Sequence, residues 1–225
     1  MTIMLNRHFL VWLSSEGWDS VMNQVHPGNV TLIEEWCTKD WPAIARRHEV
    51  GIAEDQICVG IAGPPRDDGT RPRVPLAIPR DAVSRTTAPI SLDRVISVLP
   101  TRWHDGITTL LQEAANLNIT LRVYGSASWQ FITGQPYVRN NSDIDILCYP
   151  RTQEELKRIV DLLDHTADQL PLDGEVVFPS MEAVAWKEWQ AARHSNDGRR
   201  VLVKGCHKAY LAKMDTLLHT FETTQ

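Results

Sequence analysis

The segment between Gly63 and Pro89 constrains the fold more than any other part of the sequence. It carries prolines at positions 64, 65, 72, 75, 79 and 89. Because proline lacks a backbone N–H and has a fixed φ, neither a helix nor a central strand of a sheet can run through this segment. Short apolar runs at Ile57–Ala62 and Val74–Ile78 lie on either side of its turn-rich part. This pattern predicts a β-hairpin with a long loop.

The same segment separates two regions with different patterns. Upstream, apolar residues recur at helical spacing from Ile33 to His48, with a break or cap near Asp40. Downstream, from residue 91 onward, predicted helices and strands alternate. We therefore expect an α+β protein, with a small α+β domain at 1–88 and a second domain at 89–225 that has a mixed sheet flanked by helices.

Periodicity and turn residues predict the elements of the second domain. Helices are expected at 91–117 apart from Pro100, at 126–133, at 152–167 with Thr152 as the cap, at 184–192 and at 207–221. Strands are expected at 121–124, 142–149, 175–178 and 200–203.

Charge and composition limit the classes of function. Lys and Arg total 23 against 28 Asp and Glu, a net charge of −5, so we expect no nucleic-acid partner. Apolar runs stay well short of ~18 residues, and Met1–His8 lacks the pattern of a signal peptide. We therefore expect a cytoplasmic protein with no membrane partner. The four cysteines are scattered along the chain and form no metal-binding motif.

A pair of acidic residues in the second domain has the pattern of a metal site. Asp143 and Asp145 fall two residues apart in a predicted strand, so their side chains share one face while Ile144 and Ile146 point into the core. Two adjacent carboxylates repel each other unless cations neutralise them. Mg²⁺ is the oxygen-seeking cation that also bridges to phosphate oxygens. The pattern therefore predicts a magnesium platform.

A second motif lies upstream, where a predicted strand meets a predicted helix at Gly125-Ser126. Glycine allows a sharp turn and a close approach to a ligand, and the start of a helix offers N–H groups to an anion. Alone, a Gly-Ser before a helix is ordinarily an N-cap, and an isolated Asp-x-Asp is usually a solvated pair. The two motifs together, in this order and with 16 residues between them, indicate phosphoryl or nucleotidyl transfer.

The pattern Gly-Ser-x(16)-Asp-x-Asp resembles the nucleotidyltransferase superfamily of DNA polymerase beta and the antibiotic nucleotidyltransferases. More narrowly, the chain resembles the phosphoribosyl-dephospho-CoA transferases, also called malonate decarboxylase holo-[acyl-carrier-protein] synthases. The segments that carry this resemblance are Gly125–Gln130, Thr133–Tyr137, Arg139, Ser142–Leu147, Asp173–Val177, Ala183–Glu188 and Val201–Lys204. They cover most of residues 121–215, whereas the first ~90 residues match the family only in length and general character.

The resemblance implies a reaction and a partner. A 2'-(5''-phosphoribosyl)-3'-dephospho-CoA group would pass from its triphosphate precursor, triphosphoribosyl-dephospho-CoA, to a serine of the malonate decarboxylase acyl-carrier subunit, with release of pyrophosphate. Asp143 and Asp145 would bind Mg²⁺, and a third carboxylate on an adjacent strand would complete the catalytic set. Both Asp173 and Glu175 qualify for that role. We favour Glu175, because Asp173-Gly174 also has the pattern of a turn.

The remaining predicted site residues bind substrate. Ser126 would hold the leaving phosphates, and Gly125 would allow their close approach. The candidate phosphate-binding cations are Arg139, Lys187 and Lys204, with a solvated surface charge as the alternative for each. Gln130 fits either the site or the core, and Trp129 is expected in the core.

Two other functions remain open at this point. One is a nucleotidyltransferase of the same superfamily that acts on a small molecule or on a different protein. The other is a non-catalytic binding module, against which the presence of Ser126, Asp143 and Asp145 argues. Five arginines lie near the proline-rich segment, at positions 66, 71, 73, 80 and 85. They either bind the CoA-like moiety or an acidic carrier protein, or belong to a solvated loop with no binding role.

Overall fold

The computed structural model describes residues 5–66, 68–195 and 200–222. The chain divides into two compact units. Unit 1 consists of the residues up to Pro89 together with Ile132–Tyr137, and unit 2 consists of Ile90–Phe131 together with the residues from Val138 onward. In the described part of the chain, no helix has the length and apolar character needed to cross a membrane.

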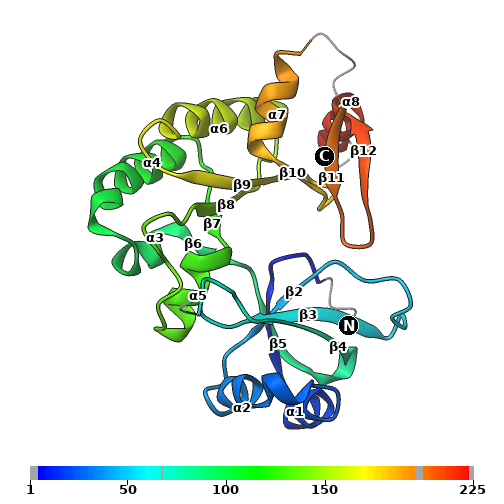
Figure 1. The fold of residues 1–225 in the computed structure, drawn as a ribbon. Helices are drawn as coiled ribbons and strands as arrows, with labels where there is room; N and C mark the ends of the chain where they lie inside the picture. The colour runs from blue at the N-terminus through cyan, green and yellow to red at the C-terminus, as the bar shows by residue number, and fades with distance from the viewer. Residues whose placement is uncertain (1–4, 67, 196–199, 223–225) are drawn as a thin grey trace. The chain divides into compact units, whose positions relative to one another are not determined.

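Unit 1 is built on an antiparallel sheet with the strand order β4-β3-β2-β1-β5. Two helices, α1 (Ser15–Met22) and α2 (Val30–Thr38), lie beside each other next to this sheet (Figure 1). Its strands are β1 (Leu10–Leu13), β2 (Ala43–Ala45), β3 (Gln56–Ala62), β4 (Arg73–Pro79) and β5 (Val83–Thr87). The predicted hairpin is confirmed as β3 and β4, and the proline-bearing β4 is an edge strand, where a missing N–H costs nothing.

The segment Ile132–Tyr137 is anchored within unit 1 by two hydrogen bonds. The hydroxyl of the buried Tyr137 donates to the carbonyl of Ala62 at 2.8 Å, and the Gln135 amide donates to Glu35 at 2.8 Å. A short stretch of the region after residue 90 therefore packs with the first 89 residues. The sequence did not indicate this connection.

Unit 2 is built on a seven-stranded sheet with the order β12-β11-β10-β9-β8-β7-β6. Its strands are β6 (Ile90–Ser91), β7 (Leu121–Val123), β8 (Ile144–Cys148), β9 (Leu172–Val177), β10 (Ala183–Ala185), β11 (Arg200–Lys204) and β12 (Ala209–Lys213). Its helices are α3 (Leu92–Val95), α4 (His104–Asn116), α5 (Gly125–Thr133), α6 (Gln153–Thr166), α7 (Trp186–Arg193) and α8 (Met214–Leu218). Figure 1 shows α4, α6 and α7 together on one side of the sheet.

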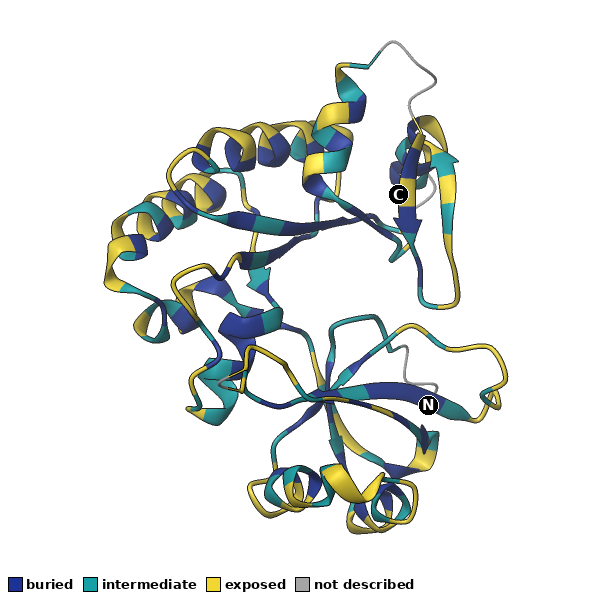
Figure 2. Ribbon diagram, viewed as in Figure 1, coloured by how far each residue is buried: buried dark blue, intermediate teal, exposed yellow. Residues whose placement is uncertain are grey.

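The predicted α+β class is confirmed, and most elements of unit 2 lie where the sequence places them. Helix α6 begins as expected, because the Thr152 hydroxyl accepts from the Glu155 N–H at 3.0 Å and caps the first turn. Buried residues line the inner sides of the helices and fill the central strands (Figure 2).

Some predicted elements are wrong. The expected helix 207–221 is the strand β12 followed by the short helix α8, because residues 209–213 pair with β11 along their whole length. The expected helix 184–192 begins only at Trp186, since Ala183–Ala185 form β10. The break expected near Asp40 is confirmed, because α2 ends at Thr38 and Asp40 has a φ of +49°, but the rest of the helical pattern to His48 is wrong, since residues 43–45 form β2. The sequence did not predict β1, α1 or β5.

Candidate active site

The acidic residues of the strands are concentrated at one place in unit 2. Among the strands that the structure describes, only β8 and β9 contain Asp or Glu, namely Asp145, Asp173 and Glu175. These two strands are also the one parallel pair in the described sheets. Their register sets Asp145 directly beside Asp173. A concentration of like charge is costly in a sheet, so its presence here indicates a function.

Asp143 and Asp145 alternate with buried apolar residues, as the sequence predicts. Asp143 immediately precedes β8 and is exposed, and Asp145 is half-buried within the strand. Ile144 and Ile146 between and after them are almost completely buried. We call Asp143, Asp145, Asp173 and Glu175 the acidic ledge, because strand alternation and register place them on one face of the sheet.

The start of α5 lies against Asp145. Gly125 has a φ of +65°, and a Cβ built on it would come within 1.9 Å of Oδ2 of Asp145. The N–H of Tyr124 also donates to the Asp145 carbonyl at 3.1 Å. Glycine is therefore required both by the backbone conformation and by the space that the carboxylate occupies. Ser126, the next residue, is buried in the first turn of α5.

Each acid of β9 has a lysine partner. Lys204 Nζ lies 2.9 Å from Oε1 of Glu175, and Lys187 Nζ lies 3.9 Å from Oδ1 of Asp173. The two pairs differ in environment, because Glu175 is 3% exposed whereas Asp173 is 47% exposed. The structure thus brings both predicted lysines to the ledge and ties Glu175 more tightly than Asp173.

Two other predicted site residues have structural contacts. The Gln130 amide donates to the Val98 carbonyl at 2.6 Å, and its oxygen accepts from the Val138 N–H at 2.8 Å, so both ends are used to hold the chain around α5. Arg139 is exposed in a turn that leads to the ledge, where its backbone N–H donates to the Ser142 hydroxyl at 2.8 Å. Trp129 is buried, as expected.

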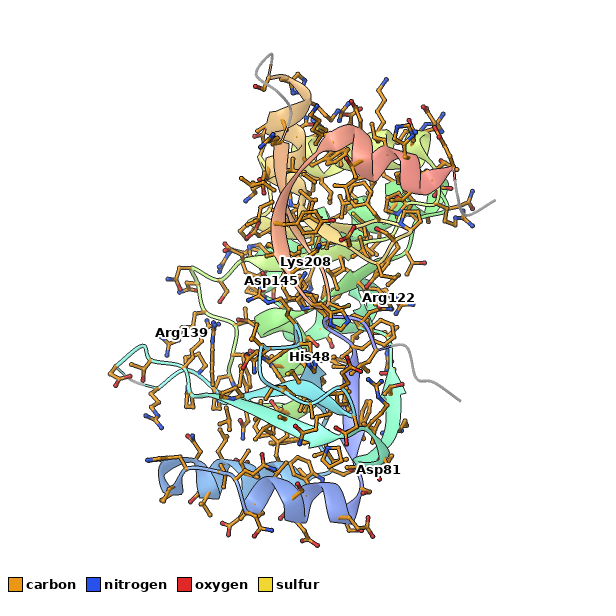
Figure 3. The ribbon with its side chains drawn as sticks, turned by 90° about the vertical axis from the view of Figure 1, so that its right-hand side faces the viewer. His48, Asp81, Arg122, Arg139, Asp145 and Lys208 are labelled. Carbon is orange, nitrogen blue, oxygen red and sulfur yellow. The ribbon has the colours of Figure 1, made fainter. Side chains whose placement is uncertain are left out.

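Arg122 is a cation near the ledge that the sequence reasoning missed. It lies on β7 opposite Leu147 of β8, on the face that carries Asp145; Figure 3 labels both charged residues. Burial is the main reason that the pKa of Tyr149 rises to about 12. The charges of Arg122 and Glu175 also act on this side chain, with opposite signs. In the sequence, Arg122 could have been noticed because it is the one charged residue in the predicted strand 121–124.

The ledge can be tested for its fit to Mg²⁺. Among the described residues, no group of three or more His, Cys, Asp or Glu side chains is placed to hold a metal ion. Mg²⁺, however, is commonly held by one or two carboxylates that leave its other positions to water and substrate phosphates. Asp143 and Asp145 supply two hard oxygen ligands, and Asp145 is directed at the helix start where phosphate would bind. The pair therefore fits a Mg²⁺ ion whose other ligands are water and the phosphate of a substrate.

Comparison with known proteins gives the family. The model of the phosphoribosyl-dephospho-CoA transferase MdcG C-terminal domain matches residues 91–215, and the model of the MdcG N-terminal domain matches residues 6–89. The chain belongs to the phosphoribosyl-dephospho-CoA transferase family. The resemblance inferred from the sequence motifs is therefore confirmed, and it extends over residues 6–89, which those motifs did not reach.

Curated relatives carry the same family name. A phosphoribosyl-dephospho-CoA transferase of Xanthomonas campestris pv. campestris strain 8004 is 30% identical over 209 residues, covering 90% of this chain and 93% of the relative. One from Xanthomonas euvesicatoria pv. vesicatoria is 32% identical, covering 89% and 91%. One from Bradyrhizobium diazoefficiens is 32% identical, covering 81% and 80%. Comparison with the solved structures gave no match.

The family name describes a transferase that handles a dephospho-CoA derivative. The acidic ledge, the start of α5 and the two lysines all lie within the part matched by the C-terminal domain model. The roles assigned to the individual side chains remain predictions.

Proposed function

We propose that this chain transfers the 2'-(5''-phosphoribosyl)-3'-dephospho-CoA group from triphosphoribosyl-dephospho-CoA to a serine of the malonate decarboxylase acyl-carrier subunit. In this step the serine oxygen forms a bond to the phosphorus attached to the ribosyl group, and pyrophosphate leaves. The observation that carries the proposal is the contact between Asp145 and Gly125, which joins a carboxylate pair to a helix start suited to phosphate.

In the proposed site, Asp143 and Asp145 hold Mg²⁺, which neutralises charge on the transferred and leaving phosphates when bound. Gly125 lets those phosphates come close to the backbone, and Ser126 directs its N–H and hydroxyl at them. Lys204 and Lys187 lie next to the ledge and add positive charge beside the leaving pyrophosphate. The Arg139 side chain is also proposed to bind phosphate, because Arg139 lies in the turn that precedes Asp143.

The serine proton needs an acceptor, and the ledge offers two. Asp173 is the register partner of Asp145 and is half exposed, whereas Glu175 lies two residues further along β9 and is held by Lys204. Asp173 is therefore the better-placed proton acceptor of the two, and Glu175 serves to hold Lys204. This reverses the preference for Glu175 that the sequence alone suggests.

A direct test is to incubate this protein with apo acyl-carrier subunit, triphosphoribosyl-dephospho-CoA and Mg²⁺. Intact mass spectrometry should show one added phosphoribosyl-dephospho-CoA group per carrier, and pyrophosphate should be released in equal amount. A carrier with its acceptor serine replaced by alanine is the control and should gain no mass.

Two results would contradict the proposal. An unmodified carrier under these conditions would exclude it, and addition of a different mass would favour another polymerase-beta-like nucleotidyltransferase. Transfer that survives chelation of divalent ions would remove the role assigned to Asp143 and Asp145.

A further inference from the structure

Two large apolar side chains are exposed next to each other at the edge of unit 2. The large apolar residues that are exposed in the described part of the chain are Val50, Leu202 and Leu211. Leu202 of β11 and Leu211 of β12 are cross-strand partners, and they are 39% and 63% exposed. Directly opposite residues share one face of a sheet. The two leucines thus form a single apolar patch, and Figure 2 shows exposed residues along β12.

The same hairpin is basic in an acidic protein. Residues 200–213 contain four Lys and Arg residues and no Asp or Glu, whereas the whole chain has a net charge of −5. Arg200 and Lys213 are cross-strand partners one step along from the leucines on the same face. Lys208 lies in the turn between the two strands and is labelled in Figure 3. The apolar patch is therefore bordered by positive charge.

Two nearby acids make hydrogen bonds to the hairpin. Glu188 of α7 accepts a hydrogen bond from the Leu202 backbone N–H at 2.7 Å, and Glu182 accepts one from the Tyr210 hydroxyl at 2.7 Å. Tyr210 is the partner of the buried Val203, so it belongs to the other face of the hairpin. Both glutamates are committed to holding the hairpin in place.

The patch lies on the sheet face that carries the acidic ledge. Lys204 is the register partner of Ala183, and Ala183 is the partner of Val177, which shares its face with Asp173 and Glu175. The ion pair between Lys204 and Glu175 agrees with this assignment. Leu202 and Arg200 follow Lys204 at two-residue steps, so they continue the same face. A protein bound on the hairpin would therefore have access to the ledge.

We propose that the hairpin face, defined as Arg200, Leu202, Leu211 and Lys213, is the docking surface for the acceptor protein. The proposal rests on the function proposed above. The partner fitted by this face is an acidic protein surface on which an apolar side chain is flanked by carboxylates. The apolar contact supplies affinity, and the surrounding cations steer the partner and fix its orientation.

Charge favours such a partner over a second copy of this chain. The leucine pair has Arg200 and Lys213 at one end and Lys204 at the other, so a two-fold contact centred on the leucines would bring cations of one copy toward cations of the other. Like charges brought together at an interface are unfavourable. An acidic partner instead neutralises Arg200 and Lys213.

The test compares a patch variant, Leu211→Ser with Lys213→Glu, with a control variant, Val50→Ser with Lys157→Glu. The control removes the exposed apolar residue of unit 1 and reverses an exposed lysine of α6, so it matches the patch variant in chemistry. Binding of apo acyl-carrier subunit is measured by calorimetry, and transfer is measured separately by intact mass at varied carrier and donor concentrations.

We expect the patch variant to weaken carrier binding about tenfold or more, to raise the KM for carrier by a similar factor, and to leave kcat and the KM for donor unchanged. The control variant should behave as the wild type. Wild-type binding should also weaken as salt is raised, because the steering charges are exposed.

Each other result has a distinct meaning. If the patch variant transfers the group as efficiently as the wild type, the docking proposal alone is overturned. Carrier binding that depends on the patch, without transfer, would overturn the proposed function and keep the docking surface. If the wild type neither binds nor modifies the carrier, both fail. If sedimentation shows a dimer that only the patch variant dissociates, with transfer intact, the face is a self-interface and the proposal is wrong.

Discussion

The two sheets of this protein differ in how they use polar residues. The five strands of unit 1 are all antiparallel and contain no Asp or Glu, whereas the sheet of unit 2 contains one parallel pair, and that pair holds Asp145, Asp173 and Glu175. Register partners on neighbouring strands share one face of a sheet, so the carboxylates of Asp145 and Asp173 can face one ligand. The comparison supports the proposed site in unit 2, and it predicts unequal effects of matched substitutions in the two units.

The largest effect is expected for Asp145→Asn. It removes a proposed magnesium ligand without removing a hydrogen-bonding side chain, so transfer should fall on the order of 10³-fold or more while thermal stability is kept or rises slightly. The measurement is kcat by intact mass together with Tm. Glu54→Gln, an acid-to-amide change at an exposed position of unit 1, is the matched control and should have no effect. Retained turnover in Asp145→Asn would remove the ledge from catalysis.

The next effect is expected for Gly125→Ala. The new Cβ would overlap Oδ2 of Asp145 in addition to straining a backbone with a φ of +65°. We expect kcat to fall about 100-fold, with a loss of about 1–2 kcal/mol in the free energy of unfolding.

Gly51→Ala in unit 1 separates these two causes. Gly51 has a φ of +90°, with nothing within 4 Å of the added Cβ, so this variant carries backbone strain alone. It should lose stability but keep its kcat. Equal activity losses in the two variants would show that strain, and not the overlap with Asp145, is responsible.

A smaller and divided effect is expected for the two acids of β9. Asp173→Asn should lower kcat about 10- to 100-fold with little change in Tm, because a proton acceptor is lost at an exposed position. Glu175→Gln should mainly lower stability, by about 1–3 kcal/mol, because it weakens a buried ion pair whose lysine can still reach water. Steady-state kinetics and thermal melts of both variants test this division. The opposite pattern would restore Glu175 as the third catalytic carboxylate.

The smallest effect is expected for Arg66→Glu with Arg71→Glu in unit 1. Both side chains are exposed, and exposed charges contribute little each, so the KM values should change by less than about threefold and kcat should not change. Arg85, from the same group, stacks on the Trp12 ring at 3.9 Å and has a structural contact already. The variant is compared with Lys39→Glu in steady-state assays. A loss of tenfold or more in donor binding would bring unit 1 into substrate recognition.

Local signals in the sequence predicted much of the fold. The proline-rich segment, the Thr152 cap and the alternation of Asp143–Ile146 each depend on neighbouring residues alone, and the structure agrees with each. Strand β12 was missed because residues 209–213 acquire their conformation from pairing with β11. When the partner strand is not known, the pattern of this short, partly exposed strand is similar to that of a surface helix.

The motifs of the candidate site consist of residues close together in the sequence, but the residues that contact these motifs come from distant parts of the chain. Gly125-Ser126 and Asp143-Ile-Asp145 could be found because each lies at a predicted junction or strand of the chain. Arg122 was missed because a single arginine in a strand has no distinctive spacing. The contacts of Gln130 could not be predicted, because its amide bonds to Val98 and Val138 depend on how the chain returns after α5.

The order of residues by itself determined the α+β class, the family resemblance and the identity of the acidic pair, because these depend on spacing over a few positions. Tertiary structure alone decided which acid of β9 lies beside Asp145, which lysine holds Glu175, and that Leu202 and Leu211 share one exposed face. The physical reason is register: Asp173 and Glu175 have the same local pattern, and only hydrogen bonding between strands distant in the sequence fixes which side chains become neighbours.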